Sequence, residues 1–353
     1  MKRFFLSLLF VSSCSGWKQK DFEKELDKPS EEALPQVTTR VQDKILEKFE
    51  VQSVEREKKE INQKKIEPKL INKKIIKKQN GKTVVKIVTA PPHVAPRGVK
   101  VLPKDYPPEL IAINANAKKV WELYIPNHSI DEKVYLDIHY LGMTVGKIMF
   151  LNKGKKIIND KEVWHLHARF KSAPFYSNIY ELNDTVDTYV TTDQFLSTRY
   201  SLIQRESKQD IDDLQLHDRD QLKTFWFYHQ KKSDGSIKDK KVEKPIPYFS
   251  IDPFSVLFFY QGLPLKDGDL YEIPIVNKGK ILILRSQVEG REEIETVKGK
   301  KKAIRLHATT KYSGETLKSG DIYFWFSDDY KHTLLKAKAK IKIGSVTADI
   351  VDE

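Results

Sequence analysis

The chain has 353 residues, with 62 Lys plus Arg, 49 Asp plus Glu, one cysteine and a formal net charge of +13. This length is enough for one large or two small domains, and 39% hydrophobic residues exclude disorder of the whole chain. A single cysteine excludes an internal disulfide and any metal or iron–sulfur site built from several cysteines. No apolar run reaches the roughly 18–20 residues of a spanning helix, which excludes a multi-pass membrane protein.

The N-terminus has the layout of a secretory signal. Lys2 and Arg3 precede an apolar stretch at residues 4–11, which is too short to remain as a membrane span. Cys14 then follows Val11-Ser12-Ser13, a position that resembles a bacterial lipobox, although Leu is commoner where Val11 stands. We therefore predict residues 1–13 as the signal peptide and Cys14 as the lipidation site. The alternative is an ordinary signal peptide that contains a cysteine by chance.

The predicted anchor also indicates a location. Two or more acyl chains hold a protein stably on a membrane, where one chain binds only marginally. Ser15 follows the cysteine, and no Asp stands there to signal retention in the inner membrane. We therefore expect an outer-membrane lipid anchor on the periplasmic side, and the membrane is the first predicted partner.

Composition separates a basic tail, residues 14–104, from a domain at residues 105–353. Residues 18–104 hold 22 basic and 13 acidic residues, but only two aromatic ones, Phe22 and Phe49. High charge with so few aromatic residues cannot bury enough surface to fold, so the tail is predicted to be a disordered tether. Within it, Val41, Ile45 and Phe49 fall at helical spacing and favour a helix over roughly residues 39–60. A proline-rich stretch from Pro91 then makes an extended lead into the domain.

Eleven lysines in residues 58–86 stand against only Glu60 and Glu67. They suit electrostatic attachment to an anionic surface, such as lipid headgroups or acidic polymers. A solvated linker in a lysine-rich protein explains them too. The basic run has no interleaved aromatic residues for base stacking, so no nucleic-acid partner is predicted.

The domain begins with an amphipathic segment at residues 110–124, and almost everything after it alternates like β-strands. Leu335, Ala337 and Ala339, for example, alternate with lysines. Glycines near residues 154, 235, 279 and 290 predict hairpin turns, and Asp252 is expected to cap a short helix. The predicted fold class is mainly β, with a strongly curved antiparallel sheet or partly open barrel.

The stretch from about residue 117 to the C-terminus resembles the Domain of Unknown Function 3108 family of exported bacterial proteins. The motifs that carry the resemblance are Tyr140-Leu141-Gly142 with Gly146, Tyr180 with Asp184-Thr185-Val186-Asp187-Thr188-Tyr189, Asp252-Pro253-Phe254-Ser255 with Tyr260 and Leu263-Pro264-Leu265, and Trp325-Phe326-Ser327-Asp328-Asp329. Gln261 departs from a usual Arg, and Thr333 from a usual Pro. The resemblance implies a strongly curved antiparallel sheet and implies no activity.

Two groups of residues are candidates for chemical sites. His165 and His167 point to one face of a strand and are weak candidates for metal ligands, since the sequence assigns no third ligand. Polar residues on the wetter face of a half-buried strand explain them better, so we predict neither metal nor cofactor. Ser327 could suggest a serine nucleophile, but no base is identifiable, and a turn at the strand end is the better interpretation.

The aromatic residues of the domain offer one binding hypothesis. The side chains that could line a cavity for a lipid-like ligand are Phe225, Phe227, Tyr248, Phe254, Phe258 and Phe259. Ordinary packing of a β core explains them equally well. The sequence thus favours a non-catalytic lipoprotein whose β domain binds a lipid-like ligand or an envelope partner. The alternatives are a structural tether that engages the cell wall or anionic glycolipid through its tail and, more distantly, a hydrolase. The sequence does not indicate an oligomeric state.

Overall fold

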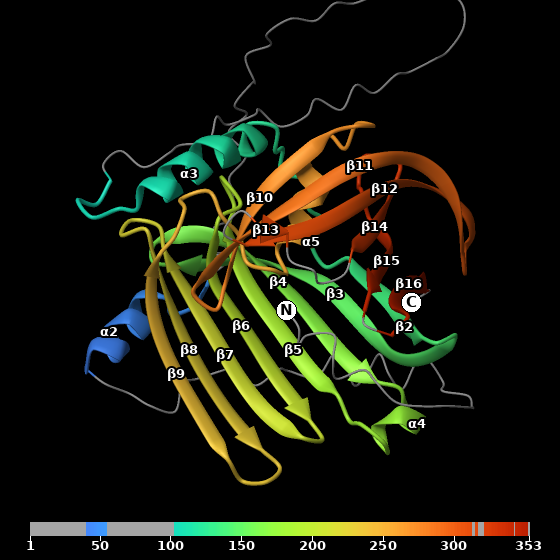
Figure 1. The fold of residues 1–353 in the computed structure, drawn as a ribbon, viewed down its shortest axis with the longest axis horizontal. Helices are drawn as coiled ribbons and strands as arrows, with labels where there is room; N and C mark the ends of the chain where they lie inside the picture. The colour runs from blue at the N-terminus through green and yellow to red at the C-terminus, as the bar shows by residue number, and fades with distance from the viewer. Residues whose placement is uncertain (1–39, 55–101, 313–314, 317–320, 342, 352–353) are drawn as a thin grey trace, which may run out of the picture.

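In the computed structural model, the described residues are 40–54, 102–312, 315–316, 321–341 and 343–351. The predicted signal peptide, Cys14 and the lysine-rich stretch 58–86 lie outside them. Figure 1 shows that the described residues form one large, strongly curved sheet, with a helix at its upper left and a shorter helix against its lower left side.

Strands dominate the described residues, and helices are few. The helices are α2 (Arg40–Lys48), α3 (Pro108–Trp121), α4 (Pro174–Ser177), α5 (Val256–Phe259) and the 3-10 helix η2 (Tyr260–Gly262). The strands are β1 (Gln52–Ser53), β2 (Lys133–Tyr140), β3 (Met143–Ile158), β4 (Lys161–Ser172), β5 (Asn183–Thr191), β6 (Ser197–Glu206), β7 (Gln209–Asp218), β8 (Lys223–Lys232), β9 (Ile237–Pro245), β10 (Leu270–Asn277), β11 (Lys280–Thr296), β12 (Gly299–Tyr312), β13 (Glu315–Thr316), β14 (Ile322–Ser327), β15 (Leu334–Lys340) and β16 (Ser345–Val351).

All sixteen of these strands belong to one sheet, and neighbouring strands pair antiparallel. The strand order is β10-β11-β12-β14-β15-β16-β2-β3-β4-β5-β6-β7-β8-β9, with β1 beside β3 and β13 beside β12. Strands β2 to β9 form one meander and β10 to β16 a second, and the two join where β16 pairs with β2. Because β9 and β10 are the two ends of this order, the sheet is curved but not closed. The predicted fold class is confirmed.

Two of the four predicted hairpin turns are instead bulges. Gly235 lies in the connection of β8 to β9, and Lys278 with Gly279, both at positive φ, forms the tight turn of β10 and β11. The stretch 152–155, however, lies within β3, where the register shifts, and Gly290 lies at a register shift within β11. A bulge bends a strand and increases its twist. These two sites therefore curve the sheet, where the sequence predicted chain reversal.

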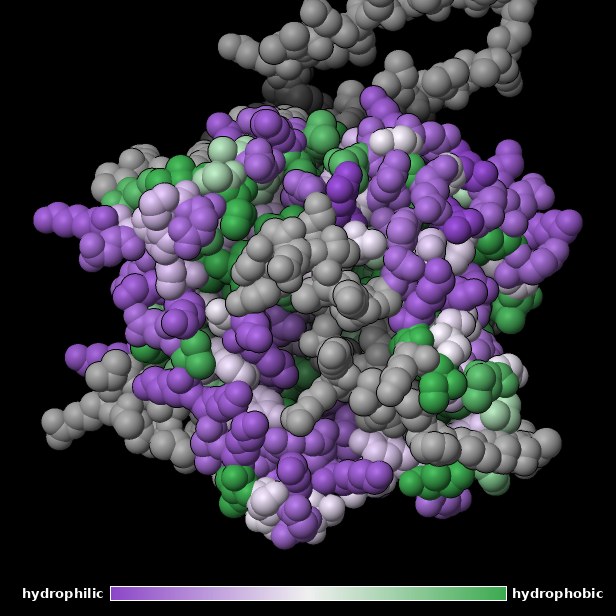
Figure 2. Space-filling model, viewed as in Figure 1, coloured by the Kyte–Doolittle hydropathy of each residue, from purple (hydrophilic) through white to green (hydrophobic). Residues whose placement is uncertain are grey.

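The main core lies inside the curve of the sheet, because alternate side chains of each strand point inward. Leu136, Leu166 and Leu202 are buried there, each at most 1% exposed. The outer surface is different in character: Figure 2 shows one face of the molecule as mostly hydrophilic, with hydrophobic residues in small groups.

One part of the outer face is apolar as well, and residues 40–54 cover it. Phe49, which follows α2, is buried against Leu214, Leu216 and Phe225 of β7 and β8. The Nζ atom of Lys48 lies 2.6 Å from Asp218, and β1 adds a short pairing to β3. The helix expected over residues 39–60 therefore spans Arg40–Lys48 here, and this part of the predicted tether packs against the sheet.

Candidate ligand cavity

A cavity of about 640 Å³ lies inside the curve of the sheet. Its wall is mainly aliphatic and aromatic, and includes Leu136, Ile148, Val186, Leu202, Phe254 and Leu284. These residues come from β2, β3, β5, β6, β11 and the segment before α5, so the wall draws on both meanders. Only the curvature of the whole sheet brings these strands around one space.

Aromatic packing closes the end of the sheet from which α3 reaches the core. The ring of Phe259 in α5 lies between Trp121 at the end of α3 and Tyr124, with centroid distances of 4.6 and 4.7 Å. The indole N–H of Trp121 donates to the carbonyl of Gln194 at 2.9 Å. A Cβ atom on Gly262 would meet the Tyr124 ring at 2.3 Å, so only glycine permits this close approach.

The turn between β10 and β11 bridges the gap between the two meanders. The Lys278 backbone N–H donates to Gln215 at 2.7 Å, and the Lys278 ammonium lies 2.9 Å from the buried carboxylate of Asp213. Burial raises the pKa of Asp213, and the charge of Lys278 opposes that shift. Both Lys278 and its neighbour Asn277 line the cavity, so this turn forms part of its wall.

Polar side chains gather where β5, β6, β7 and β8 begin or end on one rim of the sheet, which we call the mouth cluster: Tyr180, Asp184, Gln204, Glu206, Gln209 and Gln230. Gln204 donates to Asp184 at 2.9 Å and to Glu206 at 3.0 Å. Glu206 also accepts from Tyr180 at 2.5 Å and from Gln209 at 3.0 Å, while Gln230 donates to Gln209. Burial raises the pKa of Asp184 to about 7, so near neutral pH this carboxyl is only partly ionised. The cavity is therefore apolar within and polar on this rim.

The structure distributes the six aromatic residues of the binding hypothesis over several places. Phe254 lines the cavity, and Phe258 lines a second, smaller cavity of about 50 Å³. Tyr248 and Phe259 pack at the aromatic end. Phe225 and Phe227 lie on the outer face of β8 with Phe49.

The aromatic side chains of β8 that line the cavity are Trp226 and Tyr228, which the sequence hypothesis did not select. Both faces of this strand are aromatic, so alternation alone could not tell which face points inward. Phe49 distinguishes the two faces, because it covers the outer one, but it is remote from β8 in the sequence.

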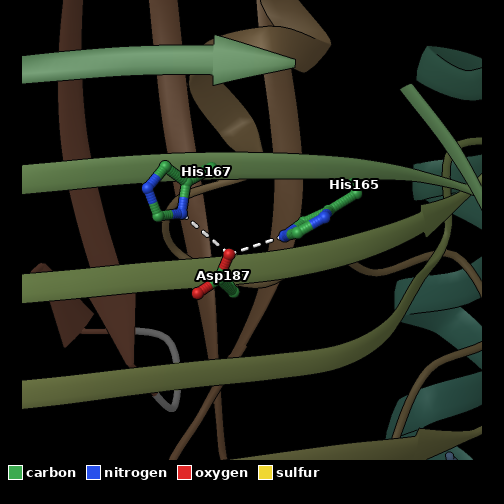
Figure 3. A group of neighbouring side chains, drawn as sticks. All are labelled: His165, His167 and Asp187. Atoms are coloured by element: carbon green, nitrogen blue, oxygen red, sulfur yellow. Dashed lines mark hydrogen bonds and ion pairs between the residues drawn. The ribbon is translucent and has the colours of Figure 1, made fainter. Parts of the chain in front are cut away.

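The two candidate metal-ligating histidines meet a third side chain on the neighbouring strand (Figure 3). A single carboxylate oxygen of Asp187, in β5, lies 2.6 Å from His165 Nε2 and 2.8 Å from His167 Nδ1. Burial opposes ionisation of Asp187, but the hydrogen bonds from the two imidazoles outweigh it and lower its pKa. Burial is the main cause that lowers the pKa of His167, which therefore favours the neutral imidazole.

These three residues supply nitrogen and oxygen atoms within 4.8 Å of one another, a donor set that suits a divalent transition metal. A cation already neighbours the carboxylate, however, since Lys153 Nζ lies 4.0 Å from the same oxygen. An added metal ion would have to displace this ammonium. The arrangement instead fits a buried hydrogen-bonded cluster that ties β4 to β5 and to the bulge of β3.

The stretch that contains Ser327, the candidate nucleophile, ends β14 and forms the turn after it. The Ser327 hydroxyl donates to Asp329 at 2.8 Å and accepts from the backbone N–H of Thr333 at 2.8 Å. Asp328 accepts from Arg291 at 3.0 Å. These bonds use the side chains locally, which agrees with the turn predicted from the sequence.

Within the described residues, no helix is both long and apolar enough to cross a membrane. Among curated proteins, none matches the chain. A family model described as a protein of unknown function, DUF3108, matches residues 136–351, which is more than half of the chain.

Three solved structures are similar to this one at low sequence identity. A β-barrel-like protein of the domain of unknown function DUF1849 from Brucella abortus has 9% identity and a TM-score of 0.42, covering 62% of this chain and 95% of that one. A candidate exported protein with a YmcC-like fold from Bacteroides fragilis has 9% identity and a TM-score of 0.29, covering 65% and 97%. A candidate lipoprotein from Parabacteroides distasonis has 11% identity and a TM-score of 0.26, covering 65% and 97%.

Proposed function

Because the chain belongs to the DUF3108 family, whose description assigns no function, we propose a function from its cavity: the protein binds a lipid-like ligand inside the curved sheet. The proposal places the protein in the cell envelope, anchored through Cys14 at the periplasmic side of the outer membrane. The observation that carries it is a space of about 640 Å³ with an apolar wall, which falls within the roughly 300–1,000 Å³ of small-molecule sites.

The physical reason is the cost of leaving such a wall exposed to water. Burying apolar surface gains about 25 cal/mol per Å². An alkyl or similarly apolar group in the cavity would gain this energy from its own surface and from the lining side chains that are only partly buried, such as Leu257 and Ile322. The mouth cluster places polar side chains at one rim of this apolar wall, so an amphipathic molecule suits the site better than a wholly apolar one.

Native mass spectrometry of the full chain tests the proposal. We expect a bound mass that remains after purification, or that appears when an amphiphile is added. The substitution Ala337→Phe adds a ring to a residue that lines the cavity and should reduce the bound fraction. Lys336→Phe adds the same ring to the opposite face of the same strand, where Lys336 pairs across from Trp325, and should not.

A wild-type protein that carries no ligand and takes up none would overturn the proposal. In that case, salt-sensitive binding of an anionic polymer that depends on the lysines of residues 58–86 would favour the tether function. If neither binding occurs, an envelope protein that docks on the domain surface becomes the better explanation.

A further inference from the structure

We infer that the ligand of this cavity is an anionic amphiphile, whose apolar chain fills the cavity and whose carboxylate or phosphate head contacts Lys238 and Lys240. This inference rests on the proposed function and adds the chemical class of the ligand. The observation that carries it is that two ammonium groups, which have no carboxylate partner among the described residues, lie beside an apolar cavity.

The charged residues that line the cavity are strongly unbalanced. Lys238, Lys240 and Lys278 line it beside its aromatic wall, against the single acidic lining residue Asp184. Lys171 and Lys338 contribute to the lining as well, but they alternate with the inward-facing Phe170 and Ala337, so their side chains point to the outer face. Burial raises the pKa of the Asp184 carboxyl to about 7, so it carries less than a full charge near neutral pH. Since Lys278 is paired with Asp213, Lys238 and Lys240 leave the charge on this side of the cavity positive, which favours an anionic ligand over a cationic one.

Lys238 and Lys240 point to the cavity side of the edge strand β9. Lys240 pairs across from Tyr228 and Lys238 from Gln230, and directly paired residues of antiparallel strands share a face. The Lys240 ammonium lies 5.5 Å from the ring centre of Trp226, which lines the cavity. Two lysines two residues apart thus present their charges on one side, next to an aromatic wall.

The neighbouring charges leave these two lysines uncompensated. Lys278 is paired with Asp213 at 2.9 Å, and Glu206 of the mouth cluster accepts three side-chain hydrogen bonds. Within the described residues, no carboxylate pairs with Lys238 or Lys240, and both side chains are exposed. An ammonium is a compact charge that binds either a carboxylate or a phosphate, so the ligand class includes both heads.

The same strand supplies a matched control. Lys241 pairs across from Phe227 and lies over the Phe227 ring at 5.6 Å, on the outer face. A Lys241→Gln variant removes one positive charge from the same strand without changing the cavity side. Any effect of net charge alone would therefore appear in this control.

The test measures binding of four probes that share a dodecyl chain: dodecanoate, dodecyl phosphate, dodecyl maltoside and dodecyltrimethylammonium, each below its micelle-forming concentration. The full chain carries Cys14→Ala, so that no acyl group of its own competes. Acetate and inorganic phosphate serve as heads without a chain. Thermal unfolding of each variant checks that the fold is kept.

We expect dodecanoate and dodecyl phosphate to bind more tightly than the neutral and cationic probes, and the heads alone to bind weakly. The double variant Lys238→Gln/Lys240→Gln should weaken the anionic probes by about tenfold, since exposed ion pairs each contribute little. Added salt should weaken them as well. Dodecyl maltoside should bind this variant and the wild type equally, and Lys241→Gln should behave as wild type.

Equal binding of all four probes, or an equal loss in Lys241→Gln and the double variant, would overturn the anionic head while leaving the lipid-like ligand in place. Tight binding of acetate or inorganic phosphate without a chain would also overturn it, since the chain would then be unnecessary. Failure of every dodecyl probe to bind would overturn the proposed function together with this inference.

Discussion

Thr188 donates a 2.6 Å hydrogen bond to the carboxylate of Asp252, and both side chains are fully buried. The two residues belong to different family motifs, and the bond joins β5 to the segment that leads into α5. Asp252 also accepts from the hydroxyl of Ser197 and from the backbone N–H groups of Phe254 and Ser255. This carboxylate therefore fixes Phe254 in the cavity wall.

Replacing Asp252 by alanine should lower the free energy of unfolding by at least about 3 kcal/mol, because several buried donors would lose their acceptor. Urea denaturation measures this loss. Asp234→Ala, in the exposed connection of β8 and β9, is the matched control and should cost less than about 1 kcal/mol. Similar losses in the two variants would contradict a structural role for the Asp252 motif.

Phe49 should behave as a core residue although it lies in the stretch that composition assigns to the tail. Its side chain is only 3% exposed. Phe49→Ala should therefore lower the free energy of unfolding by about 3 kcal/mol, the usual cost of removing a buried aromatic ring. Val54→Ala is the control, since Val54 is 43% exposed and should change stability little. If Phe49→Ala is as mild as the control, residues 40–54 do not support the sheet.

Asp187→Asn should destabilise the protein by about 3 kcal/mol, because it removes a buried charge that accepts from His165 and His167. Denaturant unfolding near neutral pH measures the effect. Asp239→Asn makes a comparable change at an exposed aspartate that lies 2.8 Å from His229, and should cost less than about 1 kcal/mol. Equal effects would mean that burial does not strengthen the Asp187 cluster.

Asp184 should make stability depend on pH in the direction opposite to that of an ion-paired carboxylate. Burial raises its pKa from 3.8 to about 7, so the folded protein retains a proton that the unfolded chain has lost. Its contribution to stability is fully present below the unfolded pKa and is lost as the pH rises through about 7. Asp184→Asn should therefore gain stability relative to wild type between about pH 4 and pH 7. Urea unfolding midpoints of wild type and Asp184→Asn, measured across this pH range, test the shift. A constant difference between the two proteins at every pH would disprove it.

Cys14→Ala should abolish labelling with radioactive palmitate and move the protein from the membrane fraction to the soluble periplasm. The physical reason is that the acyl chains supply the anchor, and they attach through this cysteine. Ser12→Ala, two residues before Cys14, leaves the thiol in place and should stay with the membrane. A Cys14→Ala protein that still sediments with membranes would rule out the lipobox.

Local patterns in the sequence determined the kind of structure. Alternation such as that of Leu335, Ala337 and Ala339 has the period of a strand, and this period depends only on backbone geometry. Antiparallel β structure could therefore be predicted without knowing any long-range contact. The family motifs pointed to the same fold, and Ser327-Asp328-Asp329 could be recognised as a turn because its hydrogen bonds are local.

Tertiary contacts decided which face of each strand became the site. In β8, Phe227 and Trp226 look equivalent in sequence, but Phe49 covers Phe227 and leaves Trp226 to line the cavity. The register between β4 and β5 placed Asp187 beside His167, and curvature of the whole sheet created the cavity itself. Periodicity is a property of neighbouring residues, whereas register, curvature and the covering of a face depend on segments far apart in the chain, so only the folded structure could supply them.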